Sequence, residues 1–373
     1  MRKLSLCGFL LVGGIFGSCE ISKSTMTASD MEAAACIKPL PAYIPPRGYV
    51  CYRATGPITI DGRLNEESWQ QVPWTEDFVD IEGDAKARPR FRTRAKMLWD
   101  DHYYYVAAEL EEPHVWATHT QHDSVIFEDN DFEIFIDPNG DSHEYYEIEM
   151  NALNTEWDLL LPRPYKDGGK AVNSWEIPGL KTAVHVNGTL NDPQDTDKGW
   201  TVEIAFPWKV LGELAYRPAP PHDGDQWRVN FSRVEWQHEI VDGKYRKVAG
   251  TKEDNWVWSP QGVIDMHRPE TWGYVQFSTA KPGTVKFRPD PAGPVRFLLH
   301  QIYYAQRDYF EKHQHWAKTL EELGQAGHKP DVTTKPILLE TTQSGYEATA
   351  EIKLASGASQ RWHIRQDARI WAE

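Results

Sequence analysis

The chain has 373 residues, which is enough for one large domain and a smaller second one. Its 40 lysine and arginine residues against 55 aspartate and glutamate residues leave a formal net charge of −15. This excess of negative charge argues against nucleic acid or an anionic lipid surface as the partner of the folded body. The 16 tryptophan and 16 tyrosine residues are numerous enough both to fill a β-sheet core and to line a binding site.

Residues 1–18 have the pattern of an export signal. Arg2 and Lys3 precede an apolar stretch at 4–15 that is too short to span a bilayer as a mature helix. The following "IFGSCE" places small residues before Cys19 and resembles a bacterial lipoprotein signal, in which the cysteine becomes the lipidated first residue. Cleavage nearby by an ordinary signal peptidase is the alternative. We therefore expect an exported protein of the bacterial cell envelope, anchored by lipid on Cys19 and facing the periplasm or the cell surface.

Residues 19–46 are rich in Ser, Thr, Ala and Pro, a composition typical of a flexible tether. Cys36 and Cys51 remain after Cys19 is lipidated. In an oxidising compartment these two cysteines could pair, but their number alone does not decide between a disulfide and two free thiols.

Residues 47–280 are predicted to form a mainly antiparallel β-sandwich of the jelly-roll type. Short strand-like runs, beginning with "ITIDG" and ending with "WGYVQF", alternate with Gly, Pro, Asn and Asp. Only "LNEESWQQV", with Asn65 as its expected N-cap, and "WKVLGEL" have short helical patterns.

The clearest strand rhythm lies in residues 127–151, "FEDNDFEIFIDPNGDSHEYYEIEMN". Apolar residues alternate with acids and aromatics on both sides of the turn signal at 138–141, which predicts a β-hairpin with one apolar face. Acids are disfavoured inside strands, so the other face is either a solvated or salt-bridged surface or a wet concave face that binds a polar ligand.

Residues 281–373 are predicted to form a separate, small α+β unit after a proline-rich linker. Residues 295–324, with Gly324 as the expected C′ residue, have a long helical pattern in their first two-thirds. Three β-runs follow, so we expect a helix packed on a three-stranded antiparallel sheet. Few contacts are expected to cross the linker.

Six segments between residues 55 and 278 occur in an order that resembles family 9 carbohydrate-binding modules. The segments are "ITIDGRLNEESWQQVPW", "RAKMLWDDHYYYVAAELEEP", "EDNDFEIFIDPNGDSHEYYEIEMNALNTEWD", "GWTVEIAFPWKVLG", "GDQWRVNFSRVEW" and "WVWSP…HRPETWGYVQF". The resemblance implies a β-sandwich related to the DOMON fold. It also implies non-catalytic binding of a poly- or oligosaccharide in support of carbohydrate catabolism.

In that family two aromatic rings clamp the terminal sugars, and polar side chains hydrogen-bond the hydroxyls. An aromatic face covers the C–H groups of a sugar, while carboxylates and amides suit its ring of hydroxyls. The second ring is expected before "RPETWG", where this chain has Met266 and His267 instead, which implies a wider and looser site. The residues implied to bind sugar, with Trp258 added from the end of a strand run, are Phe127, Glu133, Asn230, Ser232, Arg233, Trp258 and His267.

Two other functions stay open. Asp129, Asp131 and Glu133 could serve a glycoside hydrolase acting on O-glycosyl bonds, although acids on one strand would flank a substrate from one side only. A haem-binding, DOMON-type electron carrier would instead use Met97, Met266 or His267 as axial ligands.

No catalytic residue and no metal ligand is assigned from the sequence, and no cofactor is expected beyond a possible structural calcium ion. "DPNGD" offers Asp137, Asn139 and Asp141 at alternate positions, as calcium loops do, but its glycine is misplaced and the closing glutamate is absent. A plain hairpin turn is therefore favoured. The histidines of "PHVWATHTQHD" match no strong metal-binding spacing and are interpreted as loop residues.

Overall fold

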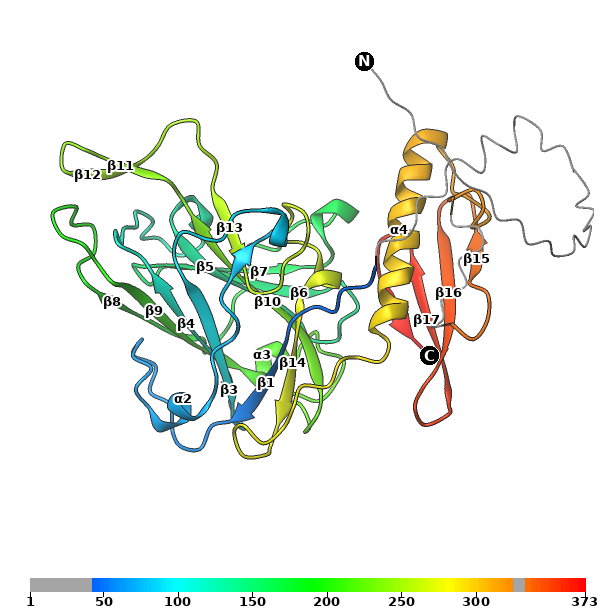
Figure 1. The fold of residues 1–373 in the computed structure, drawn as a ribbon, viewed down its shortest axis with the longest axis horizontal. Coiled ribbons are helices and arrows are strands. Elements are labelled where there is room, and N and C mark those ends of the chain that lie inside the picture. The colour runs from blue at the N-terminus through cyan, green and yellow to red at the C-terminus, as the bar shows by residue number, and fades with distance from the viewer. Residues whose placement is uncertain (1–41, 325–332) are drawn as a thin grey trace, which may run out of the picture.

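The computed structural model of the protein describes residues 42–324 and 333–373, which form a large β-rich body and a small C-terminal unit (Figure 1). The expected signal peptide, Cys19, Cys36 and most of the expected tether lie outside the described residues. None of the helices in these two ranges is both long enough and apolar enough to cross a membrane.

A single curled sheet builds the large body, and most of its strands follow the order β7-β6-β5-β10-β14-β1-β3-β4-β9-β8, with β13 joining β10 and β2. Its strands are β1 (Gly48–Arg53), β2 (Val79–Asp80), β3 (Thr93–Trp99), β4 (Tyr103–Glu111), β5 (Asp131–Asp137), β6 (Tyr145–Asn151), β7 (Glu156–Leu161), β8 (Lys181–Asn187), β9 (Gly199–Pro207), β10 (Gln226–Glu235), β13 (Asp254–Val257) and β14 (Gly273–Ser278). A separate hairpin pairs β11 (His238–Val241) with β12 (Lys244–Lys247).

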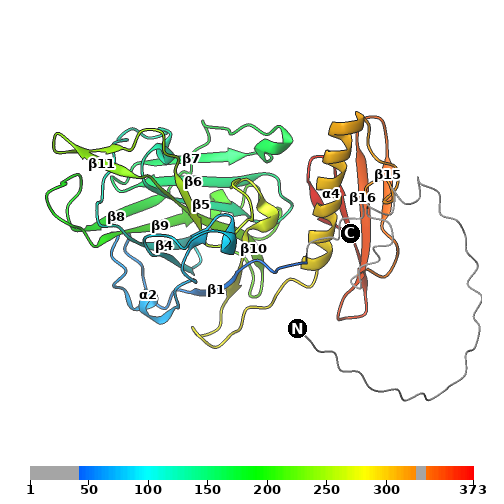
Figure 2. The same cartoon turned by 45° about the horizontal axis from the view of Figure 1, so that its top comes forward.

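The curl of the sheet brings its two halves together over one core, as the turned view in Figure 2 shows. Apolar residues of β4 and β9, such as Val106 and Ile204, share this core with Phe132 and Ile148 of β5 and β6. Cys51 is fully buried there as well. The predicted β-sandwich class is therefore confirmed. One detail differs, because β1 runs parallel to both of its neighbours, β14 and β3.

Short helices occur where the sequence predicts them, as α2 (Glu67–Gln71) and α3 (Trp208–Leu211). The N-cap of α2 is Glu66 rather than Asn65, and its side chain makes no capping hydrogen bond. The segment "ITIDG" is not a strand. Its residues Ile58 and Ile60 instead pack, partly buried, against the cluster around Trp69.

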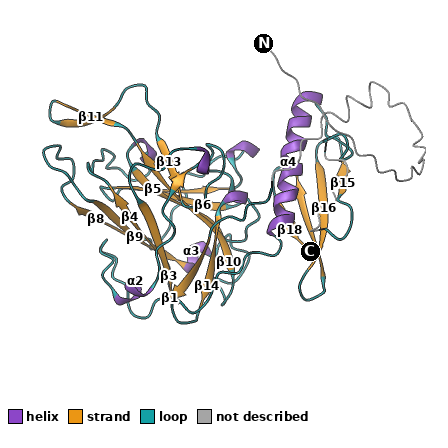
Figure 3. Ribbon diagram, in the orientation of Figure 1, coloured by secondary structure: helices purple, strands orange, loops and turns teal. Residues whose placement is uncertain are grey.

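The C-terminal unit consists of α4 (Gly293–His313) packed on a sheet of β15 (Leu338–Thr341), β16 (Tyr346–Lys353), β17 (Ser359–Arg365) and β18 (Ile370–Ala372). Figure 3 shows this helix lying along the sheet. The sheet has four strands rather than three, because the last predicted run reverses at Ala368, where φ is 65°. The helix ends well before Gly324, because Gln314 adopts a left-handed conformation and its N–H bonds the Phe310 carbonyl.

The C-terminal unit is docked on the large body, so the expectation that few contacts cross the linker is wrong. Buried Arg296 of α4 donates to the Gly140 carbonyl in the β5–β6 turn. The Ile370 N–H donates to the Asp141 carbonyl at 3.1 Å, and Arg307 pairs with Asp167 at 2.9 Å. The end of the expected tether takes part as well. Tyr43 packs on Phe297 of α4, with 5.5 Å between the ring centroids.

Candidate functional site

The predicted hairpin of β5 and β6 is confirmed, and its register brings the acids of both strands to one face. Glu133 lies opposite Glu149 on β6 and opposite Ser232 on β10. Because side chains alternate along a strand, Asp131 and Glu147 share this face with them. The opposite face carries Phe132, Ile134 and Ile148, which are buried in the core.

The four carboxylates on this face are buried, so the expectation of a wet, open surface is wrong for them. Asp131 is 0%, Glu133 5%, Glu147 4% and Glu149 2% exposed. Burial raises the pKa of Glu133 to about 7, and the adjacent Ser232 hydroxyl partly offsets that rise. Burial, reinforced by the Glu133 charge, also raises the pKa of the other three carboxyls well above their usual range.

Two exposed aromatic rings lie beside this buried group. Phe127 is 39% exposed, and its N–H donates to Glu149 Oε2 at 2.9 Å. Tyr165, in the short helix η3 (Tyr165–Asp167), is 46% exposed. Burial of its hydroxyl and the nearby carboxylates of Glu147 and Glu149 raise the pKa of Tyr165 to about 12. The acids are therefore flanked by two rings that come from distant parts of the chain.

Tyr165 was not predicted as a site residue. It stands in "PRPYKD", a loop segment without strand or helix periodicity, and its only signal is an aromatic residue among polar ones. Its ring contacts His267, with 4.4 Å between the centroids. Tyr165 thus lies where the second aromatic ring was expected from the Met266–His267 loop.

His267 itself is only partly exposed, because its ring packs against Phe135 and Tyr145 of the sheet. Its Nδ1 lies 2.9 Å from the Tyr145 hydroxyl, and burial lowers its pKa to about 4. Met266 is also engaged, because its sulfur accepts a hydrogen bond from Gln261 at 3.0 Å. Met97 lies fully buried in the sandwich core. Of the three residues considered as haem ligands, Met97 therefore lies in the sandwich core, apart from Met266 and His267, which pack on the cluster of Phe135 and Tyr145.

The structure separates the predicted residues of β10. Ser232 lies beside Glu133, whereas Asn230 uses its side chain to hold the Ser259 backbone, donating at 2.9 Å and accepting at 2.8 Å. Arg233 points to the opposite face of the strand, since it neighbours Ser232 in sequence. There it is buried and pairs with Glu112 and Glu235, each at 2.8 Å.

Trp258 is also away from the acid-lined face. Its ring is fully buried in the core, and its Nε1–H donates to Glu76 at 3.1 Å. Of the predicted sugar-binding residues, the structure therefore brings together Phe127, Glu133, Ser232 and, through Tyr165, His267. Asn230 lies on the same face of β10 as Ser232, but its side chain is engaged with the Ser259 backbone. The structure does not bring Arg233 or Trp258 to them.

The remaining polar motifs hold loops in place. Asp137 accepts hydrogen bonds from the N–H groups of Gly140 and Ser142, as a plain hairpin turn requires. Asp129 accepts from Thr118, His119 and Asn151, so all of its bonding is within the protein.

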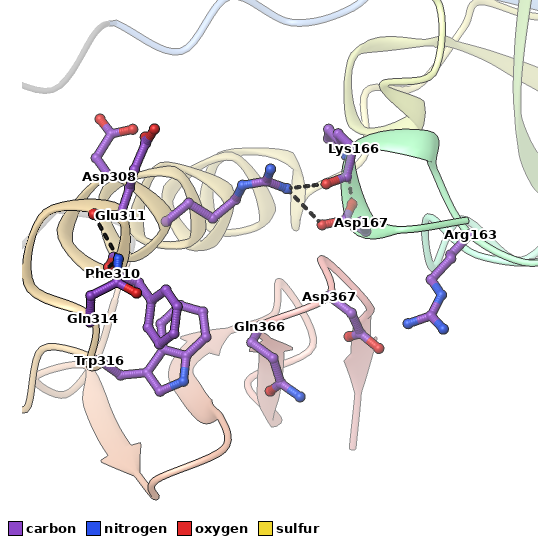
Figure 4. A pocket seen from close by; sticks show the side chains of 11 residues that line it. Arg163, Lys166, Asp167, Asp308, Phe310, Glu311, Gln314, Trp316, Gln366 and Asp367 are labelled. Carbon is purple, nitrogen blue, oxygen red and sulfur yellow. Dashed lines mark hydrogen bonds and ion pairs between the residues drawn. The ribbon is translucent and has the colours of Figure 1, made fainter. Parts of the chain in front are cut away.

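One pocket lies away from this face, at the seam between the large body and α4, with a volume of about 740 Å³. Figure 4 shows its lining, which includes Arg163, Asp308 and Trp316. Arg307 spans the seam and bonds the Lys166 carbonyl and Asp167. The charges on its walls have both signs, and of these Arg307 and Asp167 pair across the seam.

Curated proteins are similar to part of the chain. Exoglucanase XynX of Acetivibrio thermocellus is 26% identical over 156 residues, which are 42% of this chain and 12% of that enzyme. Endo-1,4-beta-xylanase A of Thermoanaerobacterium saccharolyticum is 26% identical over 156 residues, 42% of this chain and 11% of its own length. The match thus spans only about a tenth of the curated relatives.

Two solved structures are similar to this chain. A family 9 carbohydrate-binding module from Caldicellulosiruptor kristjanssonii, in complex with cellotriose, has 17% identity and a TM-score of 0.38, covering 65% of this chain and all of the module. A putative carbohydrate-binding protein from Bacteroides uniformis has 16% identity and a TM-score of 0.44, covering 62% of this chain and all of its own.

The sequence model of one family spans more than half of the chain. It matches residues 60–275, which include the whole of β5, β6 and β10 and both exposed rings. The chain belongs to the carbohydrate family 9 binding domain-like family.

Proposed function

We propose that the protein binds a poly- or oligosaccharide without cleaving it, through the face formed by Phe127, Tyr165 and the carboxylates of β5 and β6. The observation that carries this proposal is the pair of exposed rings beside the buried acids. Family membership supports it. The sugar-bound neighbour also supports it as an analogy, because its ligand is cellotriose.

The chemistry of this face suits a neutral sugar. The exposed faces of Phe127 and Tyr165 can cover the C–H groups of a sugar ring, which contributes about 1 kcal/mol for each stacked ring. The carboxylates beneath them are buried, so they act on a bound sugar through their charge rather than by open hydrogen-bonding contact, and without a bound cation they repel anionic groups. We therefore expect neutral glycans to bind in preference to uronate-rich ones.

We also propose that the protein is exported and anchored by lipid on Cys19, so that it captures glycans in support of carbohydrate catabolism at the cell envelope. The basic, apolar and small-residue pattern of residues 1–19 supports the export and the anchor. The two curated relatives that match 42% of this chain are named as an exoglucanase and a xylanase, which supports a role beside polysaccharide breakdown.

A glycan array followed by calorimetric titration tests the binding face. Phe127→Ala and Tyr165→Ala should each weaken binding of an array-positive glycan several-fold, because each removes about 1 kcal/mol of stacking. Phe127→Trp should preserve or strengthen it. Tyr216→Ala is the matched control, because Tyr216 is an exposed aromatic residue (66%) that bonds Glu144 rather than a residue of this face.

Two results would contradict the proposal. If both Phe127→Ala and Tyr165→Ala bind the glycan as tightly as the wild type does, the proposed face is not the binding site. If reducing ends are released from the glycan, and this release is lost in Glu133→Gln, the protein is a hydrolase rather than a non-catalytic binder.

A further inference from the structure

The buried acids on the β5–β6 face form a compact oxygen cluster. Asp131, Glu133 and Glu149 each contribute one carboxylate oxygen, and these atoms all lie within 4.8 Å of one another. Ser232, which is fully buried, faces Glu133 across the β5–β10 register. Its hydroxyl is close enough to Glu133 to lower the pKa of that carboxyl but does not reach hydrogen-bond geometry, and Asp131 Oδ2, Glu133 Oε2 and Glu147 Oε2 have no hydrogen-bond partner either.

Few charges or donors of the protein compensate this cluster. The Val234 N–H donates to Asp131 at 3.1 Å, and the Phe127 N–H donates to Glu149 at 2.9 Å. Within residues 42–324 and 333–373, none of the ion pairs between a carboxylate and a lysine, arginine or histidine involves Asp131, Glu133, Glu147 or Glu149. Burying ionised carboxylates without a counter-charge is strongly unfavourable.

Other buried acids of this fold have partners, which makes the cluster exceptional. Glu112 and Glu235 share the guanidinium of Arg233. Glu203 accepts three hydrogen bonds, from the N–H groups of Asp61 and Gly62 and from the Trp69 indole. The unpartnered oxygens on the β5–β6 face therefore call for a positive ligand from outside the chain.

We propose that Asp131, Glu133 and Glu149 bind a divalent cation with a preference for oxygen ligands, calcium before magnesium, with the Ser232 hydroxyl as a further donor. All the available ligand atoms are oxygens. Calcium accepts carboxylate and hydroxyl oxygens with variable coordination number and geometry, whereas magnesium requires a nearly regular octahedron. Since Glu149 also accepts the Phe127 N–H, the cation would fix the segment that presents the Phe127 ring.

Calorimetric titration of the full chain with calcium chloride, after treatment with EDTA and without glycan, tests this site. The wild type should bind one calcium ion that Glu149→Gln and Asp131→Asn either lose or bind at least tenfold more weakly. Asp123→Asn is the matched control, because Asp123 belongs to the other carboxylate group with metal-like spacing, that of His122 and Asp158. It should leave this calcium ion bound as in the wild type.

Thermal unfolding of the same proteins separates loss of the site from loss of the fold. In EDTA, Glu149→Gln should melt at or above the temperature of the wild type, because one buried charge is removed from the cluster. With calcium added, the wild type should gain melting temperature and Glu149→Gln should gain less.

The inference is overturned if the wild type binds neither calcium nor magnesium. It is also overturned if both cluster variants bind calcium as the wild type does, or if Asp123→Asn alone loses the ion. Because these titrations contain no glycan, their outcome does not depend on the proposed carbohydrate binding.

Discussion

The cost of ionising Glu133 in the cation-free protein can be measured by replacing it with glutamine, which keeps the shape of the side chain and cannot ionise. Burial raises the pKa of Glu133 from 4.5 to about 7. The folded state therefore holds this proton more tightly than the unfolded state does. The stability that this group contributes is fully present below pH 4.5 and is lost as the pH rises through about 7.

The size of the effect follows from the pKa shift. Each pKa unit corresponds to about 1.4 kcal/mol, so ionising Glu133 in the fold costs about 3 kcal/mol at full deprotonation. Most of this cost, about 2–3 kcal/mol, develops between pH 5 and pH 8. In EDTA, Glu133→Gln should therefore gain about 2–3 kcal/mol in stability relative to the wild type over that range.

Urea unfolding followed by tryptophan fluorescence gives the free energies of both proteins at the two pH values. Comparison with the wild type removes the contributions of titrating groups that do not interact with Glu133. Asp131, Glu147 and Glu149 do interact with it, since its charge raises their pKa, and their response adds to the gain in Glu133→Gln. Glu321→Gln is the control, because Glu321 is exposed and its side chain makes no hydrogen bond or ion pair with a described residue. Its stability relative to the wild type should change far less between the two pH values than that of Glu133→Gln. If the difference between Glu133→Gln and the wild type does not change from pH 5 to pH 8, the reasoning from burial is refuted.

Three further predictions concern the rest of the chain. Arg233→Ala should lower the free energy of unfolding by about 3–5 kcal/mol in urea titrations, because Glu112 and Glu235 would lose their counter-charge; an unchanged midpoint would contradict the ion-pair assignment. A chain ending at Ala280 should melt several degrees below the full chain in calorimetry, because it lacks the contacts of Arg296 and Ile370 with the β5–β6 turn; equal melting temperatures would show that the docked unit adds no stability. Cys19→Ser should move the protein from the membrane to the soluble fraction and abolish fatty-acid labelling, and continued labelling would exclude Cys19 as the anchor.

The sequence by itself determined the features that depend on local pattern. The alternation in β5 and β6 is a property of neighbouring residues. It predicts that Glu133 lies on one face of the sheet and Ile134 on the other, without reference to any tertiary contact. The order of the segments likewise predicts the family and the β-sandwich class. The family match and the fold confirm both predictions. The prediction of a hairpin that turns after Asp137 is confirmed for the same reason, because the hydrogen bonds of Asp137 lie within five residues.

Only the tertiary structure decided what each of these faces meets. The alternation of side chains along a strand predicts the face on which Glu133 and Arg233 lie. The burial of these two side chains and their bonding partners depend on segments far away in the chain. Arg233 pairs with Glu112, which is 121 residues away in the sequence, whereas Glu133 lies close to other carboxylates. Tyr165 reaches the site only because the sheet and the His267 loop fold around it. Packing between distant segments therefore separated the residues that hold the fold, such as Arg233, from those that remain to bind a ligand, such as Phe127.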